Sequence, residues 1–282
     1  MQILRESIAL RPLVDGWKAA GEEIALVPTM GALHQGHLDL VTGSRRIADR
    51  VIATIFVNPL QFNDPKDLER YPRTEEADIA KLAAAGCDAV WIGSVGDLYP
   101  EGFATTVSVR GISDRWEGEH RPGHFDGVAT VVAKLLIAVM PDAAIFGEKD
   151  WQQLAVIKRM SADLGLPIAI YGYPTVREND GLAMSSRNAL LSADERARAV
   201  ELSRALEAAA ARIVADDVAA ALDEATQQLG DAGFGPIDYV AYVDGDTLEP
   251  LETYREGGRL IAAAFLGKVR LIDNMRVAKD TP

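Results

Sequence analysis

Short apolar runs alternate with amphipathic stretches through the first 170 residues of the chain. The runs that have the length and the β-branched content of buried strands are 24–27, 51–57, 88–92, 143–146 and 167–172. A further strand, in either orientation, is predicted at 104–109. The stretches that carry apolar residues at helical spacing are about 37–48, 74–85, 125–139 and 151–164. This alternation favours βα units and a parallel sheet.

The pattern changes after Val176. A polar segment leads to Ser192-Ala193-Asp194-Glu195, a Ser-x-x-Glu capping box that opens a long alanine-rich helix to about Val214. A second helix is predicted near 218–229. The later apolar runs, which predict an antiparallel pair and a further short strand, are 237–243, 259–265 and 268–272.

Length and composition limit the classes of protein to consider. A chain of 282 residues exceeds the usual single-domain size, and its 48% of hydrophobic residues can form a core. We therefore predict an α/β domain over residues 1–176 and a smaller C-terminal α+β domain over residues 177–282. The net charge of −13 argues against a nucleic-acid partner, because phosphate backbones are bound through a basic face. Without a signal pattern or an apolar run of ~20 residues, we expect a cytoplasmic protein that binds no membrane.

The residue types that bind metals are few. Cys87 is the only cysteine, which excludes an intramolecular disulfide and a Cys-based zinc site, and its place beside a predicted strand favours a buried structural thiol. His120 and His124 have a spacing that suggests a metal, but Pro122 and Gly123 would break a helix between them, and no third ligand is nearby. We therefore favour a different role for this segment, in which Arg121 reaches a substrate anion.

The strongest candidate for chemistry is the turn after the first long strand, Pro28-Thr29-Met30-Gly31-Ala32-Leu33-His34-Gln35-Gly36-His37. Residues three apart share a helix face, so His34 and His37 can both point at one ligand, while the helix N-terminus adds amide donors and a positive dipole end. A nucleoside triphosphate is the natural ligand. Two histidines near a turn are also common as surface residues, so their spacing alone leaves both interpretations open.

Other polar residues also follow predicted strands. In open α/β sheets, ligands bind outside the carboxyl ends of the strands. His34, Asn58 and Lys149 each follow a predicted strand, so three motifs converge on one edge. The sequence has neither a Walker A motif nor GxGxxG, so phosphate recognition is assigned to the histidine turn.

Three smaller patterns each allow a functional and a structural interpretation. Lys149 could offset charge on a transferring phosphoryl group, or belong to a solvated helix start that Asp150 caps. Ser185-Ser186-Arg187 suits phosphate oxygens, but it is also an ordinary polar turn before a helix. Asn58 and Gln61 can hydrogen-bond a ligand, or Asn58 can simply cap the turn after its strand.

Five segments, in order, resemble the sequence blocks of pantothenate synthetases, which belong to the HxGH nucleotidyltransferase group that includes class I aminoacyl-tRNA synthetases. The segments are 28–37, 55–62 (IFVNPLQF), 71–74 (YPRT), 146–153 (FGEKDWQQ) and 174–188 (PTVRENDGLAMSSRN). The resemblance implies a Rossmann-like nucleotide-binding domain, closure of the C-terminal domain over the site, and a homodimer. It also implies that MgATP activates pantoate as pantoyl adenylate, which β-alanine then attacks to give pantothenate, AMP and pyrophosphate.

The resemblance also assigns roles to individual residues. The residues implied to bind ATP are Met30, His34, His37, Gly147, Lys149, Asp150, Val176, Met184, Ser185, Ser186 and Arg187. The catalytic residues among them are implied to be His34, His37 and Lys149, and those implied to bind pantoate are Asn58, Gln61 and Gln153, with Tyr71 and Arg121 as possible further contacts. Arg187 stands where the related loop of aminoacyl-tRNA synthetases usually has lysine, and pantothenate synthetases share this difference.

Two other functions remain open from the sequence. One is a nucleotidyltransferase that moves AMP onto a phosphate, and the other is a non-catalytic nucleotide-binding module on the same fold. The joint presence of Gln61, Lys149, Gln153 and both histidines of the turn disfavours the second.

Overall fold

A computed structural model gives the fold of residues 1–215 and 217–279. The chain divides into two units. The first comprises Met1–Glu148 and Val156–Pro174, and the second comprises Lys149–Ala155 and Thr175–Pro282. The short segment Lys149–Ala155, which we predicted as part of the first domain, therefore groups with the second unit.

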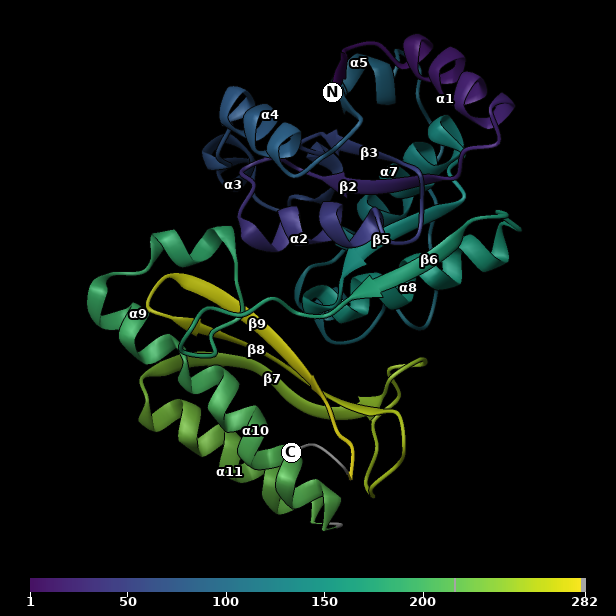
Figure 1. Cartoon of the computed structure of the whole chain (residues 1–282). Helices are drawn as coiled ribbons and strands as arrows, with labels where there is room; N and C mark the ends of the chain where they lie inside the picture. Colours follow the sequence, from purple (N-terminus) through teal and green to yellow (C-terminus); the bar gives the residue numbers. More distant parts are fainter. Residues whose placement is uncertain (216, 280–282) are drawn as a thin grey trace. The chain divides into compact units, whose positions relative to one another are not determined.

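The first unit contains a six-stranded sheet in which every pair of neighbours is parallel (Figure 1). Its strands are β1 (Gln2–Leu4), β2 (Ile24–Thr29), β3 (Arg50–Ile55), β4 (Ala89–Ile92), β5 (Ala143–Gly147) and β6 (Ala169–Tyr173). Their order is β1-β4-β3-β2-β5-β6, so the direction of strand succession reverses between β2 and β5. Ligands of open α/β sheets bind at such a reversal, outside the carboxyl ends of the strands.

Helices cover both faces of this sheet. The longer helices are α1 (Leu10–Ala19), α2 (Gln35–Ser44), α4 (Glu75–Ala84), α7 (His124–Val139) and α8 (Trp151–Asp163), and the shorter ones are α3 (Pro65–Arg70), α5 (Val95–Leu98) and α6 (Glu117–His120). Alternate residues of β2, such as Ala25 and Val27, form one buried cluster with Leu40 of α2 and Leu82 of α4. On the other face α1 and α7 contact each other and β2. Two-sided burial explains why the central strands are apolar at consecutive positions.

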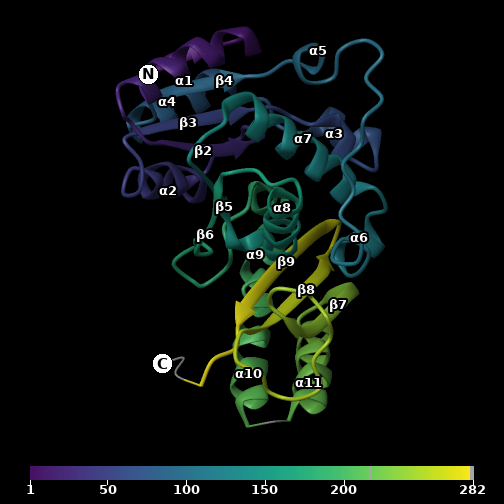
Figure 2. The same ribbon diagram turned by 90° about the vertical axis from the view of Figure 1, so that its right-hand side faces the viewer.

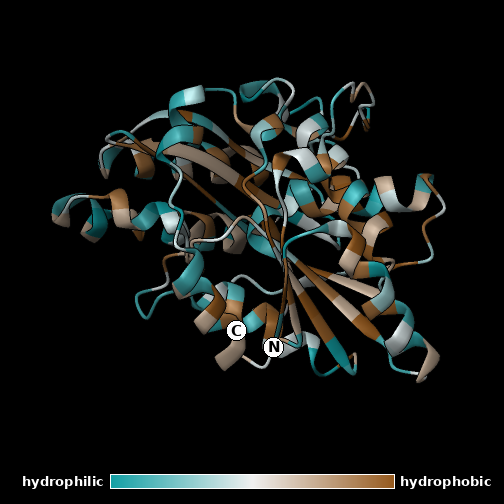
Figure 3. Cartoon of the chain, turned by 90° about the horizontal axis from the view of Figure 1, so that it is seen from above, coloured by the Kyte–Doolittle hydropathy of each residue, from teal (hydrophilic) through white to brown (hydrophobic). Residues whose placement is uncertain are grey.

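The second unit is a three-stranded antiparallel sheet packed against two helices that lie side by side (Figure 2). Its elements are α9 (Ala193–Ala199), α10 (Glu201–Val214), α11 (Val218–Asp231), β7 (Phe234–Asp244), β8 (Gly258–Leu266) and β9 (Val269–Arg276). Leu206 and Leu229 of the helices pack with Leu260 and Leu271 of the sheet. Figure 3 shows the hydropathy of the chain as a whole, with apolar stretches along strands and mixed polarity along helices.

The predicted α/β fold with a smaller α+β part is confirmed, and two local predictions are wrong. Residues 104–109, all of which the structure describes, form no strand, because the Val107 N–H donates to the Thr130 side chain of α7 (2.9 Å) rather than to a neighbouring strand. The single helix predicted from Ser192 to Val214 is divided into α9 and α10 at Val200, although that residue keeps right-handed helical angles. The prediction also missed β1, whose three residues are too few to show a period.

None of the helices in the described part of the chain has the length and apolar character needed to span a bilayer.

Candidate active site

The turn after β2 has an unusual backbone that a distant carboxylate holds in place. Gly31 and Ala32 have φ angles of 80° and 51°, the left-handed region that side chains disfavour. The Asp78 carboxylate accepts hydrogen bonds from the N–H groups of Ala32 (2.8 Å) and Leu33 (2.9 Å). A Cβ at Gly31 would lie 3.1 Å from the same carboxylate, so glycine permits this close approach.

Asp78, which holds this turn, is a residue that sequence reasoning missed. It is fully buried on α4 and also accepts a hydrogen bond from the Thr74 hydroxyl (3.0 Å). Lys81, one turn further along α4, donates to the Leu33 carbonyl (2.6 Å), so a single helix holds both polar groups of that residue. The sequence carried a signal, because Asp78 lies one helical turn before the buried Leu82 and so puts a carboxylate on the apolar face of a predicted helix.

Both histidines of the turn lie at the start of α2. His34 is the N-cap residue with extended backbone, and His37 is in the first turn. Their ring centroids are 4.1 Å apart, and the His34 N–H donates to His37 Nδ1 (3.3 Å). The structure thus places the two rings together at the N-terminal end of a helix, as the spacing predicted.

Gln61, predicted to bind pantoate, lies beside this turn. Its amide Nε2 contacts Met30 Sδ at 2.9 Å, and its Oε1 accepts a hydrogen bond from Asn58 (3.1 Å). Asn58 is 1% exposed, and its amide also binds the Gly127 carbonyl (3.0 Å) and the Tyr99 hydroxyl (2.8 Å). Asn58 therefore orients Gln61 from within the protein, and its proposed contact with pantoate stays a prediction.

The 117–125 segment supports the backbone of Gln61. Arg121 pairs with Glu117 (3.1 Å) and donates to the Gln61 carbonyl (3.1 Å), which also lies 2.9 Å from His124 Nδ1. His124 is buried, whereas His120 is exposed. Arg121 and His124 thus hold the backbone at Gln61 in this structure, and the contact of Arg121 with a substrate anion stays a prediction.

Tyr71 and Arg73 belong to the segment that follows Gln61. Tyr71 is half-buried and makes an edge-to-face contact with Phe62 (5.6 Å between centroids). Arg73 is exposed and donates to backbone carbonyls of its own segment, including that of Leu68 (3.4 Å). Glu75, two residues after Arg73, pairs with Arg5 (2.6 Å).

In the second unit, one small pocket brings together residues from two of the predicted blocks. Lys149 lines this pocket with Ser185 and Arg187, 36 and 38 positions later in the chain, and with Arg270 of β9. Gly147 is the last residue of β5, and Asp150 is exposed at the end of the short 3₁₀ turn Glu148–Asp150. The cationic and hydroxyl groups of this pocket suit the oxygens of a phosphate, although Asp273 also lines the pocket and its volume of about 10 Å³ holds no more than a water.

The Ser-Ser-Arg loop is anchored on both sides. Before it, the Met184 N–H donates to the Val176 carbonyl (2.9 Å), and Arg177 makes a bidentate contact with the buried Asp273 (2.7 and 3.0 Å). The loop then continues into the 3₁₀ turn Ser186–Leu190, which the Ser185 hydroxyl caps by accepting from the Arg187 N–H (3.2 Å). Gln153, half-buried on α8, lies in the same unit, and its contact with pantoate stays a prediction.

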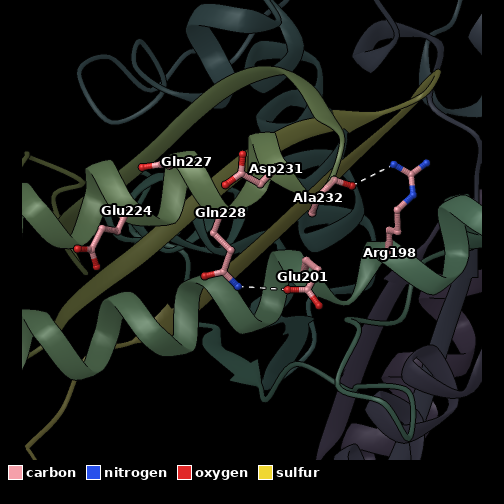
Figure 4. A pocket seen from close by; sticks show the side chains of 7 residues that line it. All are labelled: Arg198, Glu201, Glu224, Gln227, Gln228, Asp231 and Ala232. Atoms are coloured by element: carbon pink, nitrogen blue, oxygen red, sulfur yellow. Dashed lines mark hydrogen bonds between the residues drawn. The ribbon is translucent and has the colours of Figure 1, made fainter.

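An open hollow of about 510 Å³ on the second unit has different chemistry (Figure 4). It is lined by Arg198, Glu201, Glu224, Gln227, Gln228, Asp231 and Ala232. Arg198 donates to the Ala232 carbonyl and Gln228 to Glu201, so part of its polar surface is already satisfied. Its three carboxylates would repel a triphosphate, and none of the predicted site residues lines it.

The reversed strand order beside β2 and the histidine turn at the end of β2 are typical of nucleotide-binding α/β proteins. The family model described as Pantoate-beta-alanine ligase matches residues 2–276. The chain belongs to the pantoate–β-alanine ligase family. It is a ligase that uses ATP to form the amide bond between pantoate and β-alanine.

Similar proteins agree over the full length. A pantothenate synthetase of Cereibacter sphaeroides is 56% identical over 276 residues, which cover 98% of this chain and 99% of that protein. A crystal structure of pantothenate synthetase from Thermus thermophilus has a TM-score of 0.91 and 47% identity, with coverage of 98% and 99%. The pantoate-beta-alanine ligase of Francisella tularensis, solved with beta-gamma ATP and beta-alanine, has a TM-score of 0.82 and 34% identity, with coverage of 98% and 97%.

Proposed function

We propose that the ligase works through pantoyl adenylate. A pantoate carboxylate oxygen attacks the α-phosphorus of ATP, and the bond from that phosphorus to the β-phosphate oxygen breaks to release pyrophosphate. The amine of β-alanine then attacks the acyl carbon, AMP leaves, and the nitrogen loses its proton to solvent. The division into two steps is needed because a carboxylate is unreactive toward amines, whereas an acyl phosphate is a good electrophile.

The histidine turn is assigned to the triphosphate. Because His37 Nδ1 accepts from the His34 backbone, a neutral His37 ring carries its proton on Nε2, where it can donate to a phosphate oxygen. The N-terminus of α2 adds a positive dipole end. Fixed donors of this kind stabilise charge that develops on the α-phosphate during attack. The single observation that carries the proposal is this pair of histidines, held together at a strand-end helix N-terminus.

Lys149 and the Ser-Ser-Arg loop are assigned to the leaving phosphates. Their position around one pocket supports a common ligand, and Arg187 can bind phosphate oxygens in a bidentate manner. Lys149 then stabilises charge that is present mainly in the transition state. The roles of Gly147, Val176 and Met184 are to present backbone and apolar surface to the nucleotide.

Gln61 and Gln153 are assigned to pantoate, whose hydroxyl and carboxylate oxygens suit amide groups. The contact of Gln61 with Met30 supports this assignment, because it puts the amide beside the histidine turn. Positioning of the two reactants, rather than a covalent intermediate on the protein, accounts for the catalysis.

We also propose that Mg²⁺ accompanies ATP. Mg²⁺ keeps several waters and is bound by one or two carboxylates together with substrate phosphates. Asp150 is exposed beside Lys149 in the chain and offers one such carboxylate. When bound, the ion neutralises part of the phosphate charge.

We also propose that the enzyme is a cytoplasmic homodimer that binds neither nucleic acid nor membrane. The net charge of −13 supports the absence of a nucleic-acid partner. Sedimentation equilibrium at micromolar concentration tests the dimer, since a monomer mass would reject it.

Isotope exchange tests the proposed reaction sequence. Labelled pyrophosphate should enter ATP when pantoate is present and β-alanine is absent, because adenylation precedes the amine. Omission of pantoate is the control and should abolish exchange. Release of ADP and phosphate, or exchange that requires β-alanine, would reject the adenylate route.

A further inference from the structure

The start of α8 is held by side chains of the sheet in its own unit. The Lys149 carbonyl accepts a hydrogen bond from the Asn274 amide Nδ2 at 2.7 Å. Asn274 lies on β9, is 4% exposed, and is paired in register with Ile261 of β8. This contact reaches across 125 positions of sequence to the residue that we assign to phosphoryl transfer.

A second buried side chain holds Asn274 from the neighbouring strand. Arg259 of β8, 7% exposed, donates to Asn274 Oδ1 and stacks on the Trp151 ring, with its guanidinium carbon 3.3 Å from the ring centroid. The Trp151 indole N–H in turn donates to the Gly245 carbonyl (2.7 Å). Lys149 is therefore held through its backbone carbonyl, and Trp151 is held through its ring.

The side chain that links Arg259 to the Lys149 carbonyl has to be an amide. A guanidinium only donates and a peptide carbonyl only accepts, so the group between them has to accept on one side and donate on the other. The planar amide of Asn274 accepts from Arg259 through Oδ1 and donates to the Lys149 carbonyl through Nδ2. A carboxylate of the same shape could still accept from Arg259, but it would place an acceptor against the Lys149 carbonyl.

We propose that Asn274, held by Arg259, is a positioning residue that sets where the Lys149 ammonium stands during adenylate formation. This inference rests on the proposed role of Lys149. Asn274 touches the backbone of Lys149 and is assigned no contact with the substrate, so it acts only through that lysine. Misplacement of a catalytic group by about 1 Å can cost 10²-fold in rate, so a contact that holds the backbone of Lys149 can have a large effect on catalysis.

The test uses the full-length enzyme and single-turnover formation of pantoyl adenylate at saturating ATP and pantoate. Asn274→Ala and Asn274→Asp should each slow this step by roughly tenfold or more, while the KM for pantoate stays within about threefold. Tyr242→Phe is the matched control. It removes a buried hydroxyl of the same sheet that binds the backbone of Arg255 (3.0 and 3.1 Å) instead of that of Lys149, so it should lower stability and leave the rate per folded molecule unchanged.

A double-mutant cycle separates positioning from simple stabilisation. If Asn274 acts only through Lys149, adding Asn274→Ala to Lys149→Ala should slow adenylation no further, because the ammonium is already absent. Additive losses, or a wild-type rate per folded molecule in Asn274→Ala, would overturn the inference. A Lys149→Ala variant that is itself fully active would instead reject the proposed role of Lys149, so the two failures are distinguishable.

Discussion

His37 folds back onto the residue that begins its own helix, and its Nδ1 accepts the backbone N–H of His34 at 3.3 Å. The bond selects the tautomer of a neutral His37 and directs Nε2–H away from its own backbone. His34→Ala and His37→Ala should each slow adenylation by about 10²–10³, or 2.7–4 kcal/mol, the usual loss for one preorganised donor. Single-turnover rates check this, with circular dichroism as the control for folding. Two variants as active as the wild type would remove the turn from the mechanism.

Lys149→Ala should lower kcat and kcat/KM together, because the ammonium is assigned to charge that exists mainly in the transition state. We expect ATP to bind within a few fold of the wild-type affinity and adenylation to slow by at least about 10²-fold. Equilibrium ATP binding and single-turnover adenylation are the two measurements. A near-normal rate would return Lys149 to the alternative interpretation, a solvated helix start.

Gln61→Ala and Gln153→Ala should change the KM for pantoate rather than kcat. Loss of one neutral hydrogen bond is worth about 0.5–1.5 kcal/mol, so the KM for pantoate should rise roughly 2- to 10-fold with kcat little changed. The affinity for ATP should stay constant in both variants and is the internal control. A fall in kcat at unchanged KM would show that these amides act on the transition state instead.

Asp78→Ala should affect both stability and activity. It leaves the N–H groups of Ala32 and Leu33 without their acceptor, at a cost of roughly 1–3 kcal/mol for the buried Leu33 N–H and less for the partly buried Ala32 N–H. Denaturant unfolding should show this loss, and adenylation should slow in the fraction that remains folded. Glu76→Ala, an exposed change on the same helix, is the control and should alter neither quantity. Normal activity in folded Asp78→Ala would mean that the turn keeps its shape unaided.

Cys87 should resist modification in the native protein. It is 4% exposed and donates to the Ala89 carbonyl (3.0 Å), and burial raises the pKa of its thiol from 9.0 to about 11. A thiol-disulfide reagent at pH 8 should therefore label it only on unfolding, because the thiolate is the reactive form. Rapid labelling of the native enzyme would contradict the buried position.

The same thiol makes a pH-dependent contribution to folding. A pKa raised in the folded state means that the native protein holds this proton more tightly than the unfolded chain does. The contribution to stability is present below pH 9 and is lost as the pH rises toward 11. Wild-type protein should therefore lose more free energy of unfolding over this interval than Cys87→Ala does. Equal losses of free energy of unfolding in the two proteins would show that Cys87 does not cause this pH dependence.

The sequence predicted the elements whose local hydrophobic pattern matches their burial in the folded protein. The strands 24–27 and 143–146 are apolar because both faces of the sheet are covered, and the histidine turn followed from spacing within one helix turn. The contacts that crossed long sequence distances were not predictable from the chain alone. Asp78 lies 46 positions from Ala32, and Asn274 lies 125 positions from Lys149. No periodicity links such pairs, and only the folded arrangement of α4 and β9 brings them into contact.

The dependence of the histidine turn on α4 limits how this element can be reused. The ten residues from Pro28 to His37 look like a self-contained anion-binding motif, but two of their backbone N–H groups and one carbonyl are satisfied by Asp78 and Lys81. Transplanted into another strand–helix junction without that helix, the decapeptide would keep its histidines and lose the conformation that aims them. The structural unit is therefore the strand, the turn and the two helices α2 and α4, not the short string of letters by which the turn is recognised.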